Sequence, residues 1–178
     1  MKIKTRQLTL DAMLAAMCAV LAYFSITFGN QVKVTFESVP ILVGALLFGP
    51  VDGALIGGVG TLLYQFLGSG YGITATTPLW ILPYVVGGAV TGWYAKRKGF
   101  DLNQRQTVMI VVCNELIITA LNTIAIYADS KIYGYYYPGI VLGVLALRLV
   151  ICLVRALVYS FVLPLLIKPL RKVYRKDA

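Results

Sequence analysis

The segment Leu8–Phe28 reads LTLDAMLAAMCAVLAYFSITF, an apolar run that only Asp11 interrupts with a charge. A helix needs about 20 mainly apolar residues to cross the hydrocarbon core of a bilayer, and this segment is long enough. Basic residues precede it, as in a secretory signal peptide, but Phe24–Asn30 offers no clear cleavage site with small residues. We therefore interpret Leu8–Phe28 as a first transmembrane helix.

Further apolar segments follow along the whole chain. They are Val34–Phe48, Val51–Leu67, Pro78–Ala95, Thr107–Tyr127 and Gly139–Ile167. Their apolar runs are continuous rather than alternating, which favours helices over a β-barrel in lipid. Because Val34–Phe48 is short for a full crossing, we expect it to lean or to stop inside the protein. The sequence thus predicts an all-α membrane protein with six transmembrane helices, folded as one domain over residues 1–178.

The composition supports this fold class and restricts the function. Of the 178 residues, 59% are hydrophobic and 13% are charged, and the mean hydropathy of +0.81 is well above that of an ordinary soluble domain. Six helices in so short a chain leave almost no residues for a soluble catalytic or energy-coupling domain. We therefore expect the protein to act inside the bilayer or through a partner.

The basic residues are distributed very unevenly between the two sides of the predicted helices. One side holds only Lys33 and Lys131. The other side holds Lys2, Lys4, Arg6, Lys96, Arg97, Lys98, Arg105, Lys168, Arg171, Lys172, Arg175 and Lys176. The positive-inside rule then places both termini in the cytoplasm. Basic residues beside membrane helices also account for the net charge of +9, so we expect no nucleic-acid partner.

Histidine and cysteine usage argues against several chemistries. The chain contains no His, which excludes a Ser-His dyad and a His-ligated zinc site. Cys18, Cys113 and Cys152 all fall inside predicted helices, where we expect small buried packing residues rather than disulfides or metal ligands. The acidic residues are scattered without a paired motif for carboxylate catalysis. We expect no enzyme activity, no catalytic residues, no metal and no cofactor.

Small residues repeat along one face of the first helix. Ala12 and Ala16, and likewise Ala15 and Ala19, are four positions apart, which places them on a flat strip. Such a strip allows another helix to approach closely in lipid. The strip could pack against the protein's own helices or dock another subunit.

A second stretch adds a resemblance to a known family. Residues Phe36–Ile41 read FESVPI and Gly44–Pro50 read GALLFGP, with Gly53, Gly57 and Gly60 following. Together with the Ala12-x-x-x-Ala16 motif and six short helices, the first half of the chain resembles the substrate-binding S-component of energy-coupling factor (ECF) vitamin transporters, most like the folate branch. The resemblance implies that Ala12, Ala15, Ala16 and Ala19 dock a transmembrane coupling subunit, that two separate ATPase subunits supply power, and that the protein lies in a bacterial plasma membrane. The glycines, independently of any family, permit tight crossing of the third helix with its neighbours.

Charged residues at membrane depth are costly unless they are paired, so they are candidates for special roles. Glu115 and Arg155 lie at nearly the same distance from the cytoplasmic ends of their helices at 1.5 Å per residue. We predict a structural ion pair between them. Arg148 lies closer to the outer side, at a depth that suits Thr119 and Asn122. A guanidinium facing hydroxyl and amide groups could hold a carboxylate or phosphate of a ligand.

Two longer outer loops provide further candidate ligand contacts. One is flexible and rich in hydroxyl groups, and the other is aromatic. Tyrosine combines a stacking face with a polar tip, which suits a planar heterocycle, although an interfacial aromatic belt would look the same. The predicted substrate-binding residues from these loops and their flanks are Tyr71, Thr74, Trp80, Tyr133, Tyr135, Tyr136 and Tyr137.

Two classes of function remain in competition. The first is the substrate-capture subunit of an ECF importer for a water-soluble vitamin, which fits the absence of a Walker A loop. The vitamin could be folate-like, pantothenate or a corrinoid such as cobalamin. The alternative is a self-sufficient small secondary transporter or channel, for which the chain shows no convincing internal repeat.

Overall fold

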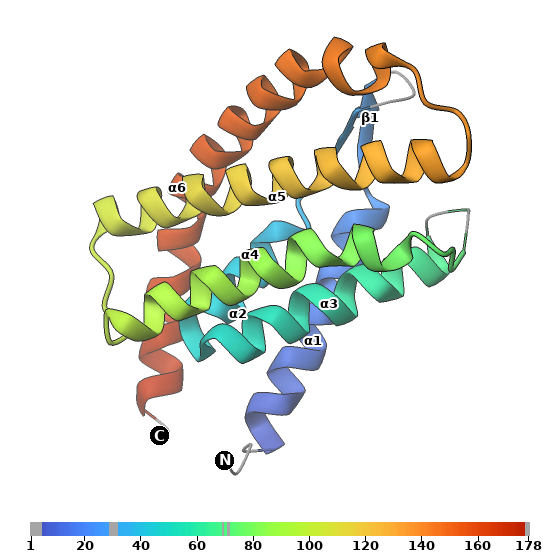
Figure 1. The fold of residues 1–178 in the computed structure, drawn as a ribbon. Helices are drawn as coiled ribbons and strands as arrows, with labels where there is room; N and C mark the ends of the chain where they lie inside the picture. The colour runs from blue at the N-terminus through green and yellow to red at the C-terminus, as the bar shows by residue number, and fades with distance from the viewer. Residues whose placement is uncertain (1–4, 29–31, 69, 71, 177–178) are drawn as a thin grey trace.

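The computed structural model describes residues 5–28, 32–68, 70 and 72–176, and most of them are helical (Figure 1). The α-helices are α1 (Thr5–Tyr23), α2 (Ser38–Phe48), α3 (Pro50–Leu67), α4 (Thr77–Arg97), α5 (Gln104–Ile132) and α6 (Leu145–Lys176). A π-helical turn, η1 (Gly139–Gly143), precedes α6, and two short strands, β1 (Ile26–Phe28) and β2 (Val32–Val34), lie between α1 and α2. The predicted all-α class with six helices is confirmed, with this small hairpin as an addition.

The hairpin corrects the predicted ends of the first two helices. The strands β1 and β2 are antiparallel, and Ile26 is paired with Val34. The first helix therefore does not extend to Phe28, and the second does not begin at Val34. Both strands are rich in β-branched and aromatic residues, which favour a pleated strand, and a short apolar run has no periodicity to separate strand from helix.

Helices α5 and α6 also differ from their predicted bounds. Helix α5 begins at Gln104 rather than Thr107, because the Asn103 amide donates to Gln106 Oε1 at 3.1 Å in a capping box. Residues 139–167 do not form one continuous α-helix, because η1 precedes α6 and α6 continues to Lys176. Three of the described segments are long and apolar enough to cross a membrane, namely Thr5–Tyr23, Gln104–Ile132 and Gly139–Arg171.

Helix α2 forms the centre of the molecule. It has only 11 residues, and Ile41, Leu42 and Leu46 along it are at most 1% exposed. Helices α3, α4 and α6 pack against α2. The expectation that the second apolar segment stops inside the protein is therefore confirmed, and its apolar residues form the core rather than a lipid-facing surface.

The outer faces of the long helices are apolar. On α6, Leu157, Phe161 and Leu165 are 62–74% exposed, as expected for side chains that contact lipid. Cys18 and Cys152 are buried as predicted, but Cys113 is exposed, so the expectation of a buried packing residue was wrong for Cys113. Its position on α5 faces away from the other helices, which hydropathy alone does not reveal.

Helices α3 and α4 are in direct backbone contact through glycines. A Cβ atom on Gly88 would lie 2.3 Å from the Gly53 carbonyl oxygen, and one on Gly53 would lie 2.7 Å from the Gly88 oxygen. Gly57 approaches the Tyr84 carbonyl oxygen in the same way. The predicted role of these glycines in tight helix crossing is confirmed.

We expect Gly88→Ala to destabilise the protein by roughly 1–3 kcal/mol, because the new methyl group must push α3 and α4 apart. Thermal unfolding in detergent measures the effect. Gly143→Ala is the matched control, because a Cβ there meets nothing within 4 Å. Equal melting temperatures for the two variants would show that the backbone contact does not limit stability.

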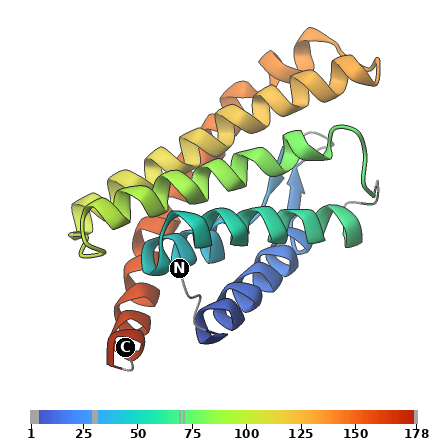
Figure 2. The ribbon, with the colours of Figure 1, turned by 60° about the horizontal axis from the view of Figure 1, so that its bottom comes forward.

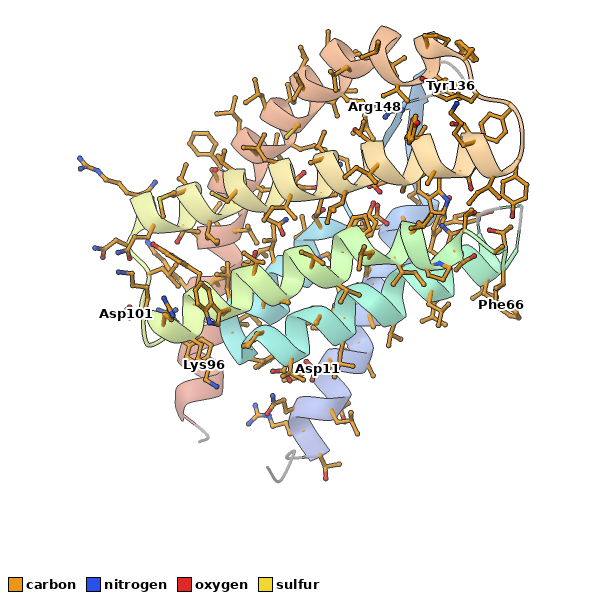
Figure 3. The ribbon with its side chains drawn as sticks, viewed as in Figure 1. Asp11, Phe66, Lys96, Asp101, Tyr136 and Arg148 are labelled. Carbon is orange, nitrogen blue, oxygen red and sulfur yellow. The ribbon has the colours of Figure 1, made fainter. Side chains whose placement is uncertain are left out.

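The connections lie at two opposite ends of the helices. The start of α1 and the end of α6 lie at the lower end of Figure 1, and Figure 2 agrees. The hairpin and the far ends of α3 and α5 lie at the other end. In Figure 3, Lys96 and Asp101 lie at one end and Arg148 and Tyr136 at the other.

Candidate functional site

A charged pair lies in the interior between α5 and α6. Arg155 Nη2 is 3.0 Å from Glu115 Oε2, Glu115 is fully buried and the Arg155 side chain is 11% exposed. The same Nη2 atom donates to Ser38 Oγ at 2.8 Å. Asn114 Nδ2 donates to Glu115 Oε1 at 3.4 Å. The structure therefore contains the ion pair that the helix depths predict, and it fixes α5 to α6 and to the start of α2.

A second buried carboxylate belongs to the same polar cluster. Glu37 is 3% exposed, and its Oε1 accepts hydrogen bonds from Thr35 Oγ1 at 2.7 Å and from the Tyr84 hydroxyl. Sequence reasoning missed this role of Glu37. A carboxylate inside the predicted apolar segment Val34–Phe48 was the available signal.

Tyr159 completes the cluster from α6. It is fully buried, and its hydroxyl donates to the Thr35 carbonyl oxygen at 3.1 Å. The Arg155 guanidinium carbon lies 5.8 Å from the centre of the Tyr159 ring. Buried charges of this kind are stable only when their partners are held in place, so the cluster must form together with the helix packing.

Arg148 lies closer to the end that carries the hairpin, on the first turn of α6 (Figure 3). Its Nη1 atom is buried and has no hydrogen-bonding partner within the described part of the chain. On the neighbouring α5, Thr119 and Asn122 are partly buried. A buried N–H group without an acceptor costs free energy, and an anionic ligand group could satisfy it.

The residues of the two outer loops make contacts within the chain. Thr76 Oγ1 donates to Asp129 Oδ1 at 2.5 Å, and Trp80 Nε1 donates to the same oxygen at 3.4 Å. The Tyr135 hydroxyl donates to Asp129 Oδ2. Thr74 is tied into the same turn, because its amide donates to Thr77 Oγ1 at 2.8 Å. Sequence reasoning missed Asp129, the residue on which Trp80 and Tyr135 meet.

The other tyrosines that were predicted to contact ligand differ in their contacts and in their exposure. Lys131 Nζ lies 4.2 Å from the centre of the Tyr136 ring, and Tyr127 meets this ring edge-on at 5.4 Å between centroids. Tyr133 and Tyr137 are exposed. Tyr71, also predicted to contact ligand, lies outside the described residues.

The structure divides the alanine strip of α1. Ala12 and Ala16 are exposed, and Ala19 is partly buried. Ala15 is 3% exposed, and its carbonyl oxygen faces Gly60 of α3 so closely that a Cβ on that glycine would lie 2.9 Å away. In this chain, therefore, Ala12 and Ala16 remain accessible to another subunit, whereas Ala15 packs internally.

The chain is similar to known proteins both in its sequence and in its fold. The family described as "ECF transporter, substrate-specific component" matches residues 6–167. No curated protein matches the chain. Solved structures that are similar in fold include the two that follow. The crystal structure of FolT bound with folic acid has 17% identity and a TM-score of 0.64, and the match covers 89% of this chain and 91% of that one.

The second similar structure is the S-component for biotin from an ECF-type ABC transporter. It has 19% identity and a TM-score of 0.68, and the match covers 94% of this chain and 91% of that one. At these identities the likeness concerns the fold, whereas the family match spans nearly the whole sequence. The chain belongs to the family of substrate-specific components of ECF transporters.

Proposed function

We propose that this protein captures a water-soluble vitamin at the outer face of a bacterial plasma membrane and delivers it through a partner module. The module consists of a transmembrane coupling subunit and two ATPase subunits. Family membership supports the general role. The unpartnered Nη1 atom of Arg148 carries the proposal of the substrate site.

The proposed site lies between α5 and α6 on the side of the hairpin. Arg148 offers a planar cation, while Asn122 and Thr119 offer an amide and a hydroxyl group from α5. Such a set suits a carboxylate or phosphate. Thr74, Trp80 and the tyrosines 133 and 135–137 supply aromatic and hydroxyl groups for the rest of a planar molecule.

A folate-like compound is the first candidate substrate, because it combines a planar ring system with acidic groups. One of the similar structures is bound with folic acid, and the other is the S-component for biotin. Both compounds carry a carboxylate. Pantothenate also carries one. Cobalamin would present a phosphodiester rather than a carboxylate to Arg148.

The charge distribution supports an orientation with both termini in the cytoplasm. The start of α1 and the end of α6 lie at the same end of the molecule (Figure 1), which is the end with most Lys and Arg residues. Arg148 then faces the outer side, and Ala12 and Ala16 flank the middle of α1 on an exposed surface that a coupling subunit can reach.

We expect Arg148→Ala to weaken binding of an acidic vitamin by roughly 2–4 kcal/mol, because a partly buried anion loses a charge-assisted hydrogen bond. Arg148→Lys should recover only part of this loss, since an ammonium group cannot reproduce the planar fork. Calorimetric titration with folic acid, biotin and pantothenate measures the affinities.

The control for this prediction is Arg171→Ala. Arg171 pairs with the exposed Asp101 at 3.1 Å on the opposite side of the molecule, so its loss should leave vitamin affinity unchanged. Wild-type affinity in Arg148→Ala would place the site elsewhere. A bound vitamin without an acidic group would leave Arg148 with a structural role.

The function itself is tested by purification and reconstitution. We expect the protein to co-purify with ATPase and coupling subunits, and mass spectrometry to find a vitamin that remains bound through purification. Liposomes that contain the whole module and ATP should accumulate this vitamin. Accumulation by liposomes with this chain alone would instead support a self-sufficient transporter.

A further inference from the structure

One carboxylate joins the start of α4 to the loop after α5 at the end of the molecule that carries Arg148. Asp129 near the end of α5 accepts from Thr76 in the turn before α4, from Trp80 on α4 and from Tyr135 in the loop after α5. We call these four residues the Asp129 clasp. The donors are 53, 49 and 6 residues from Asp129 in sequence, so the clasp closes long loops through a single side chain.

Each segment of the clasp is stiffened by its own hydrogen bonds. Thr76 is 1% exposed, and its hydroxyl also lies 3.1 Å from Thr74 Oγ1. On the other side, the Tyr135 amide donates to the Ser130 carbonyl oxygen at 3.0 Å. The turn before α4 and the loop after α5 are therefore each held by their own hydrogen bonds. The bonds to Asp129 connect these two segments to one another.

The clasp combines a short bond from Thr76 at 2.5 Å with a longer, weaker one from Trp80 at 3.4 Å. An ionised carboxylate shortens and strengthens the hydrogen bonds it accepts, and the buried Thr76 hydroxyl has little access to competing water. Trp80 and Tyr135 each use their polar tip on Asp129, so this carboxylate helps to fix the orientation of both rings. Both residues are among the predicted ligand contacts.

We propose that Asp129 is a positioning residue that holds Trp80 and Tyr135 over the bound vitamin and thereby sets the rate at which the vitamin escapes. This inference rests on the proposed function. Escape requires the two loop segments to separate, and separation breaks the bonds to Asp129. Entry also requires the clasp to open, because its bonds are present without ligand. Loss of the clasp therefore raises both rates, but dissociation rises more, because the vitamin also loses the two positioned rings.

The first experiment needs no ligand. The chain has two tryptophans, and Trp93→Phe leaves Trp80 as the single reporter. In this background, Asp129→Ala should raise acrylamide quenching of Trp80 fluorescence about twofold, because the loops open more often. Asp129→Asn keeps the side-chain shape without the charge and should fall between wild type and Ala.

The matched control is Asp101→Asn, which removes a carboxylate that is 86% exposed at the opposite end. It should leave quenching of Trp80 unchanged. Tyr135→Phe removes one donor while keeping Asp129, and it should produce part of the Asp129→Ala effect. Unchanged quenching in both Asp129→Ala and Tyr135→Phe would overturn the inference that the clasp holds the loop segments together.

The second experiment measures exchange of bound vitamin. Protein is loaded with radiolabelled folic acid, biotin, pantothenate or cobalamin, and release into excess unlabelled vitamin is followed. Asp129→Ala should release the bound vitamin about tenfold faster, with a clearly smaller increase in the association rate. An equal change in both rates, or no change in release, would overturn the positioning role even if quenching rises.

The two experiments separate this inference from the proposed function. If wild-type protein binds none of these vitamins, the proposed function fails and the role of Asp129 in escape fails with it. The quenching result still decides whether Asp129 holds the loops together. If vitamin binds and Arg148→Ala weakens binding while Asp129→Ala leaves release unchanged, only the inference about Asp129 is overturned.

Discussion

Replacing Ala16 with Trp is expected to abolish vitamin uptake while leaving vitamin binding intact. Ala12 and Ala16 are exposed and one helical turn apart on α1, and a coupling helix can approach such small residues closely. An indole side chain at position 16 would hold the helices apart, and dispersion attraction falls off steeply with distance. The proposed vitamin site near Arg148 lies toward the other end of the molecule.

Three measurements check this expectation. Vitamin affinity of the isolated variant should equal that of wild type, pull-down of the coupling subunit should fail, and uptake by reconstituted liposomes should be lost. Met17→Trp is the matched control, because Met17 is 52% exposed on a different face of α1. Undiminished assembly of Ala16→Trp with the coupling subunit would remove this face as the docking surface.

Replacing Ala15 with Trp should have a different effect from replacing Ala16. Because Ala15 is buried against Gly60 of α3, Ala15→Trp should lower the melting temperature of the isolated protein, whereas Ala16→Trp should not. Overpacking of a close helix contact costs roughly 1–3 kcal/mol or more. The pair of variants thus distinguishes the surface of α1 that packs internally from the surface proposed for docking.

The second large effect concerns the buried charges. Glu115→Gln should destabilise the protein by about 3–5 kcal/mol, because Arg155 then loses its ion-pair partner in the interior. Arg155→Met should cost at least as much, since it leaves Glu115 and Glu37 without that cation. The double variant Glu115→Gln with Arg155→Met should be milder than the sum of the two.

Unfolding in detergent measures this double-mutant cycle. A coupling free energy near zero would show that the two side chains do not stabilise one another. A matched control combines Glu115→Gln with Arg171→Ala, whose partner Asp101 is exposed. These two changes should be additive, because the residues share no contact.

The sequence predicted part of the site for a simple reason. Charges inside apolar helices stand out, and the rise per residue gives their depth, so Glu115 and Arg155 could be matched without a structure. The same reasoning could not find the roles of Glu37 and Asp129. Their partners Tyr84 and Thr76 lie 47 and 53 residues away, and no local pattern connects residues so far apart.

The predicted loop tyrosines show a related limit. Aromatic residues in a loop can contact ligand, lipid or one another, and composition does not distinguish these cases. The structure places Tyr136 between Lys131 and Tyr127 and directs the Tyr135 hydroxyl to Asp129. Their contacts depend on the path of the loop, which follows from the ends of α5 and η1.

The sequence by itself determined that this is a helical membrane protein, roughly where its helices lie and which two buried charges meet. Hydropathy and charge are properties of each segment alone, so no packing information is needed. Only the tertiary structure decided which face of each helix is internal, as the separation of Ala15 from Ala16 shows. In lipid, both the core and the outer surface are apolar, so a helix has no polar side to mark its exposed face. The assignment of inner and outer faces, on which the proposed docking surface and the Asp129 clasp depend, follows from how the helices pack.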